Sequence, residues 1–177
     1  GFVMMLNKAI DIIEPDKSLV ACDAGKPTFR HKQFEAYKGT RKPLDEELIV
    51  QFPIVREYLD AAGIKRYEQE GYEADDIIGS MAKCCKDVQT TILTSDRDLL
   101  QLIDSSTHVL LMKKGLSEMD LMDEQNLMDT YGITPSQVID MKGLMGDTAD
   151  NIPGVAGVGE KTALRLLNQY STVENVY

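Results

Sequence analysis

The stretch from Gly146 to Ala163 constrains this chain more than any other part of the sequence, because it joins two acids to a run of glycines. Asp147 and Asp150 lie three residues apart, so one helical turn or tight loop directs both carboxylates to the same side. Backbone N–H groups in a glycine-rich turn can approach a bulky anion at the start of a helix. The glycines are Gly154, Gly157 and Gly159, and Lys161 follows them. The stretch predicts a metal-type acid pair beside a phosphate-binding turn; a surface acid pair beside an ordinary turn is the alternative.

Size and composition narrow the class of protein. The chain has 177 residues, 43% of them hydrophobic, which suits one globular domain with or without a small appendage. No apolar run approaches the length of a membrane span, so we expect no membrane partner. The three cysteines, Cys22, Cys84 and Cys85, lack metal-ligand spacing. We expect them in the core of a protein from a reducing cytosol.

The charge is unevenly distributed along the chain. The net charge of 19 − 29 = −10 argues at first against a nucleic-acid partner. Between Lys26 and Pro43, however, six basic residues accompany the single acid Glu35, a local balance of 6 − 1 = +5. Aromatic residues are interleaved with these cations, which suits a single nucleic-acid strand with bases on rings and phosphates on cations. The alternative is a solvated basic face whose aromatic residues belong to the core.

Short apolar strands alternate with amphipathic helices along most of the chain. We expect strands near residues 18–22, 64–68, 88–93 and 107–112. We expect helices over residues 2–13, 45–63 with a break at Pro53, 73–85, 134–145 and 160–169, and from about Thr172 onward. The helix from Glu73 should bury Ile77, Ile78, Met81 and Cys85. This alternation predicts an α/β fold with a mostly parallel sheet and flanking helices, followed by a helical layer.

Acidic residues recur in four clusters, most of them at predicted element ends. Asp23 and Asp96 come at or just after the carboxyl end of a strand, where open α/β sheets bind ligands, and Glu73 begins a helix. The eight carboxylates are Asp23, Glu73, Asp75, Asp76, Asp96, Asp98, Asp147 and Asp150. If they converge, they need compensating charge, which two Mg²⁺ ions would supply. Helix caps and a solvated loop are the alternatives for the middle two clusters.

Five segments together form a recognisable set of motifs. Three are acidic or hairpin segments, YEADD (Tyr72–Asp76), TSDRDLLQL (Thr94–Leu102) and Gly146–Ala163, and two are basic, FRH (Phe29–His31) and YKGTR (Tyr37–Arg41). They resemble the acid motifs, the helix-hairpin-helix and the helical arch of the bacterial 5′-nuclease family, the 5′→3′ exonuclease domains of DNA polymerase I and their flap endonuclease relatives. The resemblance covers Gly1 to Tyr177 in the family's order. It implies a PIN-like 5′-nuclease core over residues 1–132, with a basic arch at about 26–43. A helix-hairpin-helix DNA-binding region over residues 133–177 is implied to follow.

The resemblance also implies an activity and its partners. These are a structure-selective, Mg²⁺-dependent 5′→3′ exonuclease and flap endonuclease of DNA replication and repair, cleaving phosphodiesters by a two-metal mechanism. The implied substrates are DNA with a 5′ flap, nicked or branched duplexes and RNA primer–DNA junctions. The implied location is the bacterial cytoplasm, at the nucleoid, in a protein either free-standing or fused to a DNA polymerase.

Roles for individual residues follow only from their positions in the family's motifs. The first metal is assigned to Asp23, Glu73 and Asp75, with Asp76 beside them, and the second to Asp96, Asp98, Asp147 and Asp150. Lys38 and Arg41 match arch cations that grip the scissile phosphate and are assigned as catalytic. The DNA-binding set is Arg30, Tyr37, Lys38, Arg41, Gly154, Gly157, Gly159 and Lys161. Mn²⁺ is expected to replace Mg²⁺, and K⁺ to bind the helix-hairpin-helix through backbone carbonyls.

One element of the family pattern has no counterpart in this sequence. The family begins with a strand ending in an Asp, ahead of the point that matches Gly1, and continues with helices beyond the point that matches Tyr177. We therefore expect both regions to be truncated and the first metal site to lack one ligand. The activity of this fragment is expected to be impaired.

Three other interpretations remain open. A topoisomerase/primase-type site also pairs a Glu with Asp-x-Asp after a strand, and a PIN-type ribonuclease shares the acid clusters, but neither accounts for the glycine hairpin. A non-catalytic DNA-binding module of a polymerase would use its acids structurally. Two Mn²⁺ sites among the acids would favour the nuclease, and cleavage of a 5′ flap would separate it from the ribonuclease.

Overall fold

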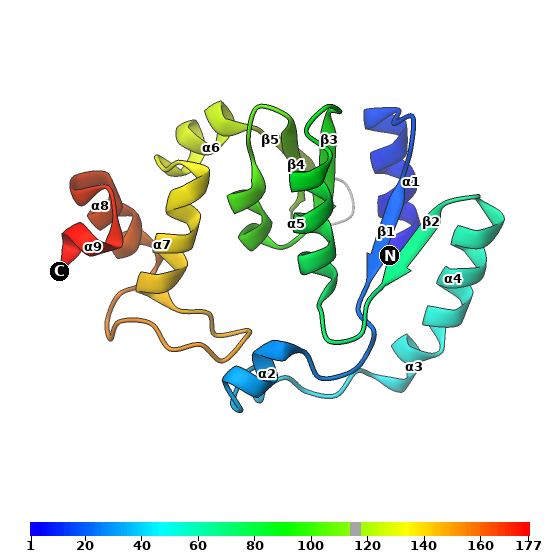
Figure 1. The fold of residues 1–177 in the computed structure, drawn as a ribbon, viewed down its shortest axis with the longest axis horizontal. Helices are drawn as coiled ribbons and strands as arrows, with labels where there is room; N and C mark the ends of the chain where they lie inside the picture. Colours follow the sequence, from blue (N-terminus) through cyan, green and yellow to red (C-terminus); the bar gives the residue numbers. More distant parts are fainter. Residues whose placement is uncertain (114–117) are drawn as a thin grey trace.

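The computed structural model describes residues 1–113 and 118–177 (Figure 1). The segment up to Cys84 forms α1 (Phe2–Ile13), β1 (Leu19–Cys22), α2 (Phe29–Gln33), α3 (Glu46–Ile49), α4 (Gln51–Ala61), β2 (Lys65–Glu68) and α5 (Ala74–Cys84). The remainder forms β3 (Thr90–Thr94), the 3₁₀ helix η1 (Arg97–Leu102), β4 (Thr107–Met112), β5 (Met119–Met122), α6 (Glu124–Tyr131), α7 (Pro135–Met145), α8 (Glu160–Tyr170) and α9 (Val173–Val176).

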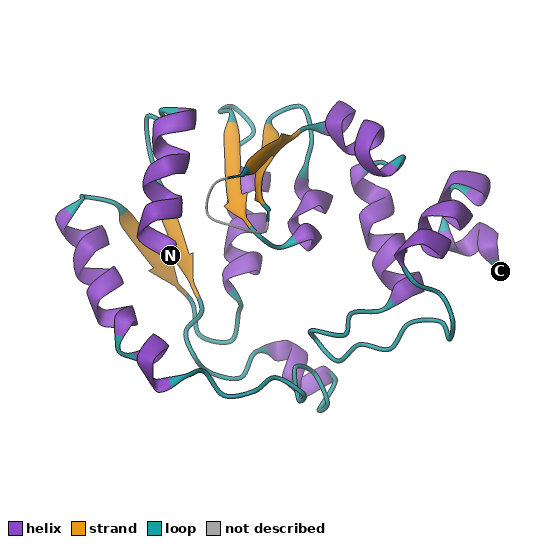
Figure 2. Cartoon of the chain, turned by 180° about the vertical axis from the view of Figure 1, so that it is seen from behind, coloured by secondary structure: helices purple, strands orange, loops and turns teal. Residues whose placement is uncertain are grey.

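The strands form a mostly parallel α/β arrangement, as the sequence predicts. β1 pairs with β2 in parallel, and β3 pairs with β4 in parallel, while β5 runs antiparallel to β4. The described strands belong to two sheets, β1-β2 and β3-β4-β5. Figure 2 shows β3, β4 and β5 between α1 and α6. The parallel pairs aim their carboxyl ends at one edge of the molecule, the lower edge of Figure 1.

Four elements, α2, η1, β5 and α6, were not expected, and one break is misplaced. β5 and α6 have no counterpart among the predicted elements, although Asp123 caps α6 by accepting a bond from Asn126 N and Gly132 ends it at φ 69°. The break in the expected helix 45–63 lies at Val50, not at Pro53. Pro53 sits in the first turn of α4, where a backbone N–H has no intrahelical partner to lose.

The expected burial of α5 and of the cysteines is wrong in part. Ile77 and Ala82 are buried in α5, but Met81 is 41% exposed. Cys84 and Cys85 are exposed free thiols and Cys22 is half-buried, so the prediction of core cysteines fails. The physical reason is that α5 ends at Cys84: Cys85 leaves the helical conformation at φ −99°, ψ 49° and with it the buried stripe.

The helical end of the chain shares its core with the β3-β4-β5 sheet. Val109 and Leu127 belong to the same buried cluster as Val138, Leu144 and Leu167, from α7 and α8. α7 begins as expected, with a capping box between Thr134 and Gln137 and Pro135 in its first turn. This shared core places the α7–α8 loop at the edge where the parallel strands end (Figure 1). Among the described residues, no helix is both long enough and apolar enough to cross a membrane.

Candidate active site

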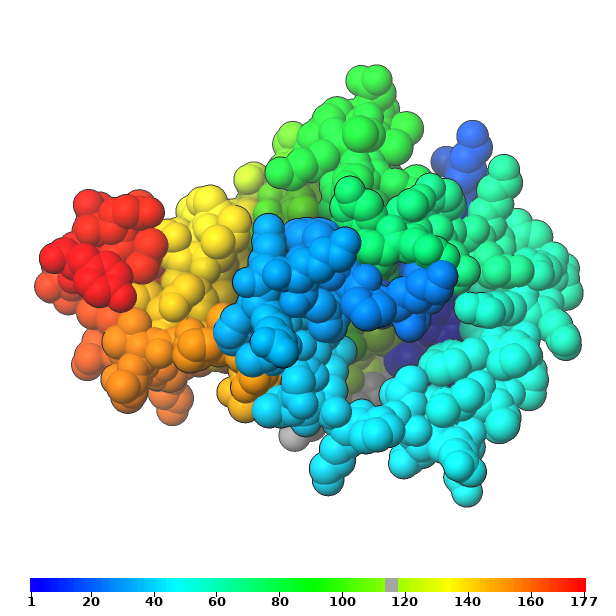
Figure 3. All heavy atoms as spheres, turned by 60° about the horizontal axis from the view of Figure 1, so that its bottom comes forward, coloured from blue at the N-terminus to red at the C-terminus, as the bar shows by residue number. Residues whose placement is uncertain are grey.

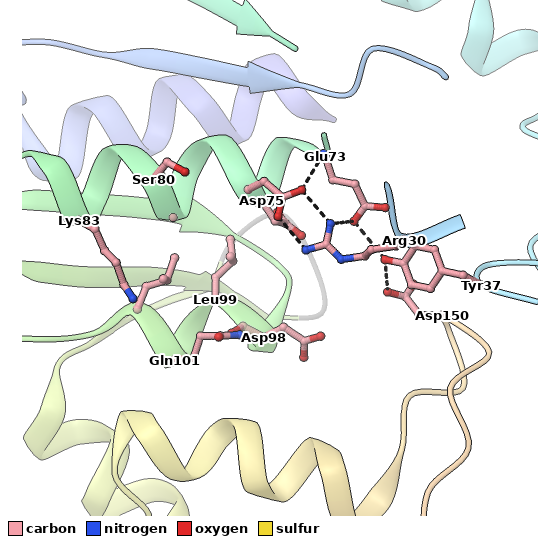
Figure 4. A pocket seen from close by; sticks show the side chains of 13 residues that line it. Arg30, Tyr37, Glu73, Asp75, Ser80, Lys83, Asp98, Leu99, Gln101 and Asp150 are labelled. Carbon is pink, nitrogen blue, oxygen red and sulfur yellow. Dashed lines mark hydrogen bonds and ion pairs between the residues drawn. The ribbon is translucent and has the colours of Figure 1, made fainter. Parts of the chain in front are cut away.

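Carboxylates from four separate segments meet at the carboxyl edge of the strands. Asp23 follows β1, Asp96 follows β3, Glu73 precedes α5, and Asp147 and Asp150 lie in the loop between α7 and α8. A cavity of about 370 Å³ opens at this edge (Figure 4). The acids that line it are Glu73, Asp75, Asp76, Asp98 and Asp150. The structure therefore gathers acids from three of the four segments into one pocket.

The remaining three predicted acids lie beside the pocket. Asp23 Oδ1 accepts a hydrogen bond of 2.8 Å from the backbone N–H of Ala74, and Asp23 and Asp96 act electrostatically on Asp75. Asp147 is linked to Asp98 through one lysine, described below. None of the eight acids lies on another face of the molecule.

Local hydrogen bonds explain how the sequence sets some of these carboxylates in place. Asp76 Oδ2 accepts a bond of 2.9 Å from the N–H of Glu73, which closes a capping box at the start of α5. Asp96 Oδ1 caps η1 by accepting 2.8 Å from the N–H of Asp98. Asp76 and Asp96 thus act as helix caps, the alternative role that the sequence allowed for the middle clusters. Asp75 lines the pocket and caps no helix.

The basic arch, residues 26–43, crosses this edge and contacts the acids directly. Figure 3 shows the arch on the face that comes forward, next to the α7–α8 loop. Lys38 Nζ lies 2.7 Å from Glu73 Oε1, and Arg41 Nη2 lies 2.6 Å from Asp150 Oδ1. The backbone joins them as well, since Lys38 N–H donates to Asp150 O at 2.9 Å. The arch cations therefore neutralise the acids in this conformation.

Tyr37 and Arg30 complete the contacts of the arch with the pocket (Figure 4). The Tyr37 side chain is only 6% exposed, and its hydroxyl lies 3.1 Å from both Glu73 Oε2 and Asp150 Oδ2, so it can donate to either. Burial and the two neighbouring carboxylates raise the pKa of Tyr37 well above its usual value, which keeps the hydroxyl protonated. Arg30 makes a bidentate pair with Asp76 at 2.8 and 2.7 Å.

Lys142 is a site residue that the sequence analysis missed. Its Nζ lies 2.7 Å from Asp98 Oδ1 and 2.8 Å from Asp147 Oδ2, so it joins two acid clusters. A lysine in the last turn of a helix commonly interacts with the helix dipole, so its place in the sequence did not indicate a role in the site. The available signal was its spacing, since the end of α7 turns Lys142 toward an acid five residues later.

The pKa values of the acids report how crowded this edge is. Desolvation, then the negative charges of Asp96, Asp23 and Glu73, raise the pKa of Asp75 from 3.8 to about 6. Desolvation also raises the pKa of Asp98, against the opposing hydrogen bond from Lys142. The bidentate bond from Arg30 lowers the pKa of Asp76. Asp75 itself thus has no ion pair with a described cation, whereas its neighbour Asp76 is paired with Arg30.

The acids suit a divalent cation by chemistry, although they are not arranged around one here. Among residues 1–113 and 118–177, no three His, Cys, Asp or Glu side chains are placed to hold one metal ion. The ion pairs of Lys38, Arg41 and Lys142 hold Glu73, Asp150, Asp98 and Asp147 instead. Carboxylate oxygens are the ligands that Mg²⁺ and Mn²⁺ prefer, and the raised pKa of Asp75 marks the place where a cation would relieve like-charge repulsion.

The glycines of the α7–α8 loop have two different surroundings. A Cβ on Gly154 would lie 2.2–2.4 Å from backbone atoms of Met145 and Gly146, so Gly154 is required for close packing. Gly157, at φ +78°, and Gly159 have open space around them, and Lys161 is exposed in the first turn of α8. Gly154, Gly157 and Gly159 are all exposed, so each can approach a phosphate, and Gly154 has the packing role in addition.

The fold and the site together define the class of α/β nuclease domains that combine an acid pocket with a helix–loop–helix region. Two family models match this chain. The 5′-3′ exonuclease N-terminal resolvase-like domain covers residues 1–132, and the 5′-3′ exonuclease C-terminal SAM fold covers residues 133–177. The chain belongs to the 5′-3′ exonuclease family.

Similar proteins include both polymerases and a smaller exonuclease. The chain is 50% identical over 178 residues to the DNA polymerases I of Bacillus caldotenax and Bacillus subtilis, covering 99% of this chain and 20% of theirs. It is 42% identical to a 5′-3′ exonuclease of Mycoplasma pneumoniae, of which it covers 61%. The chain therefore spans about a fifth of the length of the polymerases that it matches.

Solved structures show the same fold at lower identity. The T5 5′-exonuclease with bound zinc aligns with a TM-score of 0.79 at 21% identity, over 99% of this chain and 68% of that one. The bacteriophage T5 flap endonuclease, in a complex with DNA and metal ions, aligns with a TM-score of 0.78 at 20% identity, over 99% and 68%.

Proposed function

We propose that this chain is a divalent-metal-dependent, structure-selective nuclease, a 5′→3′ exonuclease and flap endonuclease acting on DNA. The observation that carries the proposal is the meeting of Glu73 and Asp150 with Lys38 and Arg41 over one pocket. The acids can bind metal ions and the cations can bind a phosphate, so both groups would act on the same phosphodiester bond. Membership of the 5′-3′ exonuclease family supports this choice over a ribonuclease or a non-catalytic module.

The proposed metal sites use the acids gathered at the strand ends. Asp23, Glu73 and Asp75 would hold one Mg²⁺, and Asp96, Asp98, Asp147 and Asp150 a second, with Mn²⁺ as a substitute. Two such ions supply an activated water and neutralise the leaving 3′-oxygen when they are bound. Asp76, held by Arg30 and by its cap at Glu73, fits the positioning of α5 better than direct ligation.

The chain's own residues perform the remaining tasks. Lys38 and Arg41 would turn from Glu73 and Asp150 to the scissile phosphate, where their charge stabilises the transition state. The protonated Tyr37 hydroxyl keeps Glu73 and Asp150 oriented. The open glycines Gly157 and Gly159, Lys161 and a K⁺ ion on backbone carbonyls would hold a duplex phosphate, a contact that carries no sequence information.

The proposed substrates follow from this division of labour. A duplex held at the α7–α8 loop and a single strand passing the basic arch together make a 5′ flap, a nicked or branched duplex, or an RNA primer–DNA junction. The polymerase relatives support a role in replication and repair beside a DNA polymerase, in the bacterial cytoplasm. Cleavage would leave a 5′-phosphate on the product.

Substitution of Lys38 tests the proposal directly. We expect this chain to cut a 5′-flap DNA with Mg²⁺, at a rate reduced by the metal ligand that the first site is expected to lack, and to stop in EDTA. Lys38→Ala should lower kcat about 100-fold or more, because it removes charge stabilisation at the scissile phosphate, while duplex affinity falls only a few-fold. The measurements are single-turnover cleavage and fluorescence anisotropy.

Lys32→Ala is the matched control, since Lys32 lies in the same arch but outside the pocket. It should leave kcat within a few-fold of the native value. Equal losses of cleavage and binding in Lys38→Ala would reduce Lys38 to an electrostatic tether. Native protein that binds DNA but never cuts it in Mg²⁺ or Mn²⁺ would overturn the nuclease proposal in favour of a binding module.

A further inference from the structure

The pocket extends well beyond the acids that the proposed chemistry uses. Its lining continues from Asp75 along α5 to Ser80 and Lys83, and from Asp98 along η1 to Gln101. Figure 4 shows Ser80, Lys83 and Gln101 at the end of the pocket away from Arg30 and Tyr37. One end of the pocket is therefore acidic, and the other is lined by hydrogen-bond donors and a cation.

The far end is built by one face of α5. Asp76, Gly79, Ser80 and Lys83 share that face, because Gly79 and Ser80 each lie three or four residues from both Asp76 and Lys83. Gly79 contributes no side chain, and a Cβ there would lie 3.5 Å from the Leu102 side chain, so α5 and η1 lie close together on this side of the pocket. Seven residues separate Asp76 from Lys83, a rise of about 10 Å along the helix axis. This is the reach of a short stretch of nucleic-acid strand.

The charge at the far end is free to meet an anion. Lys83 forms no ion pair with any other residue that the structure describes, whereas Arg30, the other cation in the lining, is held by Asp76. Gln101 is held in place because its Nε2 donates 2.8 Å to Asp98 O, and its second N–H stays available. The Ser80 hydroxyl adds a further donor beside them.

We propose that Lys83, with Ser80 and Gln101, forms a phosphodiester subsite for a nucleotide next to the scissile phosphate. The subsite rests on the proposed nuclease function, because the acids at the other end define where the scissile phosphate lies. A substrate strand whose reacting phosphate lies between Asp75 and Asp98 continues along the pocket. Its neighbouring phosphate then meets Lys83, which offsets the repulsion that the strand experiences from the acids.

A purely structural role for Lys83 makes a different prediction. Lys83 lies in the last turn of α5, where a cation stabilises a helix through its dipole. In that case the loss of Lys83 lowers the stability of the protein, and its effect on cleavage does not depend on the charge of the DNA backbone. A phosphate contact depends on the charge of one particular linkage.

The test combines a substitution with a neutral linkage in the DNA. Single methylphosphonate linkages replace, one at a time, the phosphates on either side of the scissile bond of a 5′-flap DNA. On all-phosphate DNA, Lys83→Ala should lower kcat/KM about tenfold relative to native protein. When one particular neighbouring linkage is neutral, Lys83→Ala and native protein should have the same kcat/KM. Lys83→Arg should restore most of the loss. Lys65→Ala, an exposed lysine on β2 outside the pocket, should behave like native protein.

Each outcome decides between the alternatives. A Lys83→Ala loss that is the same on every DNA, or absent, overturns the subsite and leaves the nuclease proposal standing. A thermal shift without any dependence on the linkage assigns Lys83 to the helix end and also overturns the subsite. Native protein that cuts none of the DNAs in Mg²⁺ overturns the nuclease function and the subsite with it.

Discussion

At the scale of single residues, the acids of the pocket differ by what surrounds them. Asp76 has a guanidinium partner and a lowered pKa, whereas Asp75 has other carboxylates as neighbours and a pKa raised to about 6. Two adjacent residues of one helix thus serve different purposes: Asp76 stabilises the fold, and Asp75 stores repulsion that a bound cation would relieve. Sites of this kind commonly trade stability for activity.

Asp75→Asn should therefore stabilise the metal-free protein and abolish its activity. We expect the free energy of unfolding at pH 8 to rise by about 1 kcal/mol, a modest value because water screens a partly exposed carboxylate. Cleavage should fall below detection as a proposed metal ligand is lost. Urea denaturation in EDTA and single-turnover cleavage in Mg²⁺ measure the two effects. Asp87→Asn, an exposed loop acid, is the control and should change neither; a destabilised Asp75→Asn would contradict the account of Asp75.

The sign of the pH dependence follows from the same shift. Because the folded-state pKa of Asp75 lies above its usual 3.8, the neutral form is favoured by folding. The contribution of Asp75 to stability without metal is therefore most favourable below about pH 4 and declines as pH rises through about 6. Metal binding requires the ionised form and weakens as pH falls through the same range. Urea denaturation of native and Asp75→Asn protein between pH 4 and 8 should show a stability difference that shrinks toward pH 4.

At the scale of elements, the turn between α7 and α8 holds two acids against the pocket. Gly146, at φ +72°, and Gly154 bring the two ends of the loop into backbone contact, and Val155 N–H donates to Leu144 O at 2.8 Å. Asp147 and Ile152 exchange two backbone hydrogen bonds between these ends. The position of Asp147 and Asp150 is thus set by backbone packing that excludes side chains at two glycines.

Gly154→Ala should destabilise the protein and disable the site together. The added Cβ meets backbone atoms that cannot move aside, so we expect a loss of about 2–3 kcal/mol in the free energy of unfolding. Cleavage should fall at least tenfold as the loop acids move. Gly143→Ala is the matched control: Gly143 lies inside α7 with open space around it, so that change should stabilise by about 0.5–1 kcal/mol. Urea denaturation measures both, and unchanged stability in Gly154→Ala would mean that the loop relaxes without cost.

At the scale of the whole molecule, opposite charges are separated between the arch and the rest of the chain. The net charge is −10, yet the basic arch lies over the acid pocket (Figure 3). Arg30, Lys38 and Arg41 are all engaged with acids in this conformation. Metal ions at the acids would release these cations for DNA, which couples metal binding to DNA binding through the electrostatics of the fold.

Salt should reveal how many cations engage DNA phosphates. If Arg30, Lys38, Arg41 and Lys161 each contact one phosphate, the logarithm of the affinity for flap DNA falls against the logarithm of salt with a slope of about −3 to −4. Anisotropy titrations in Ca²⁺, from low to moderate KCl, measure the slope. Lys161→Ala should reduce its magnitude by about 1. A slope near zero would count against phosphate contacts altogether.

The sequence alone determined the kinds of elements and the residue types of the site. Hydrophobic periodicity is local, so the strands around β1 to β4 and the helices α1, α5, α7 and α8 could be predicted from short windows. The acid clusters were visible because helix starts and strand ends have local signals. β5 was not, because its four residues, MDLM, are too few to show a strand period, and they pair only with β4.

Only the tertiary structure decided which charges meet. Lys38 reaches Glu73 across 35 residues, and Tyr37 reaches Asp150 across 113, distances in sequence at which local patterns carry no information. Lys142 and Lys83 have the same ordinary appearance in the sequence, each in the last turn of a helix. The packing of α7 directs Lys142 toward two acids, and the packing of α5 directs Lys83 into the far end of the pocket. The direction of a side chain depends on how the whole helix packs against its neighbours.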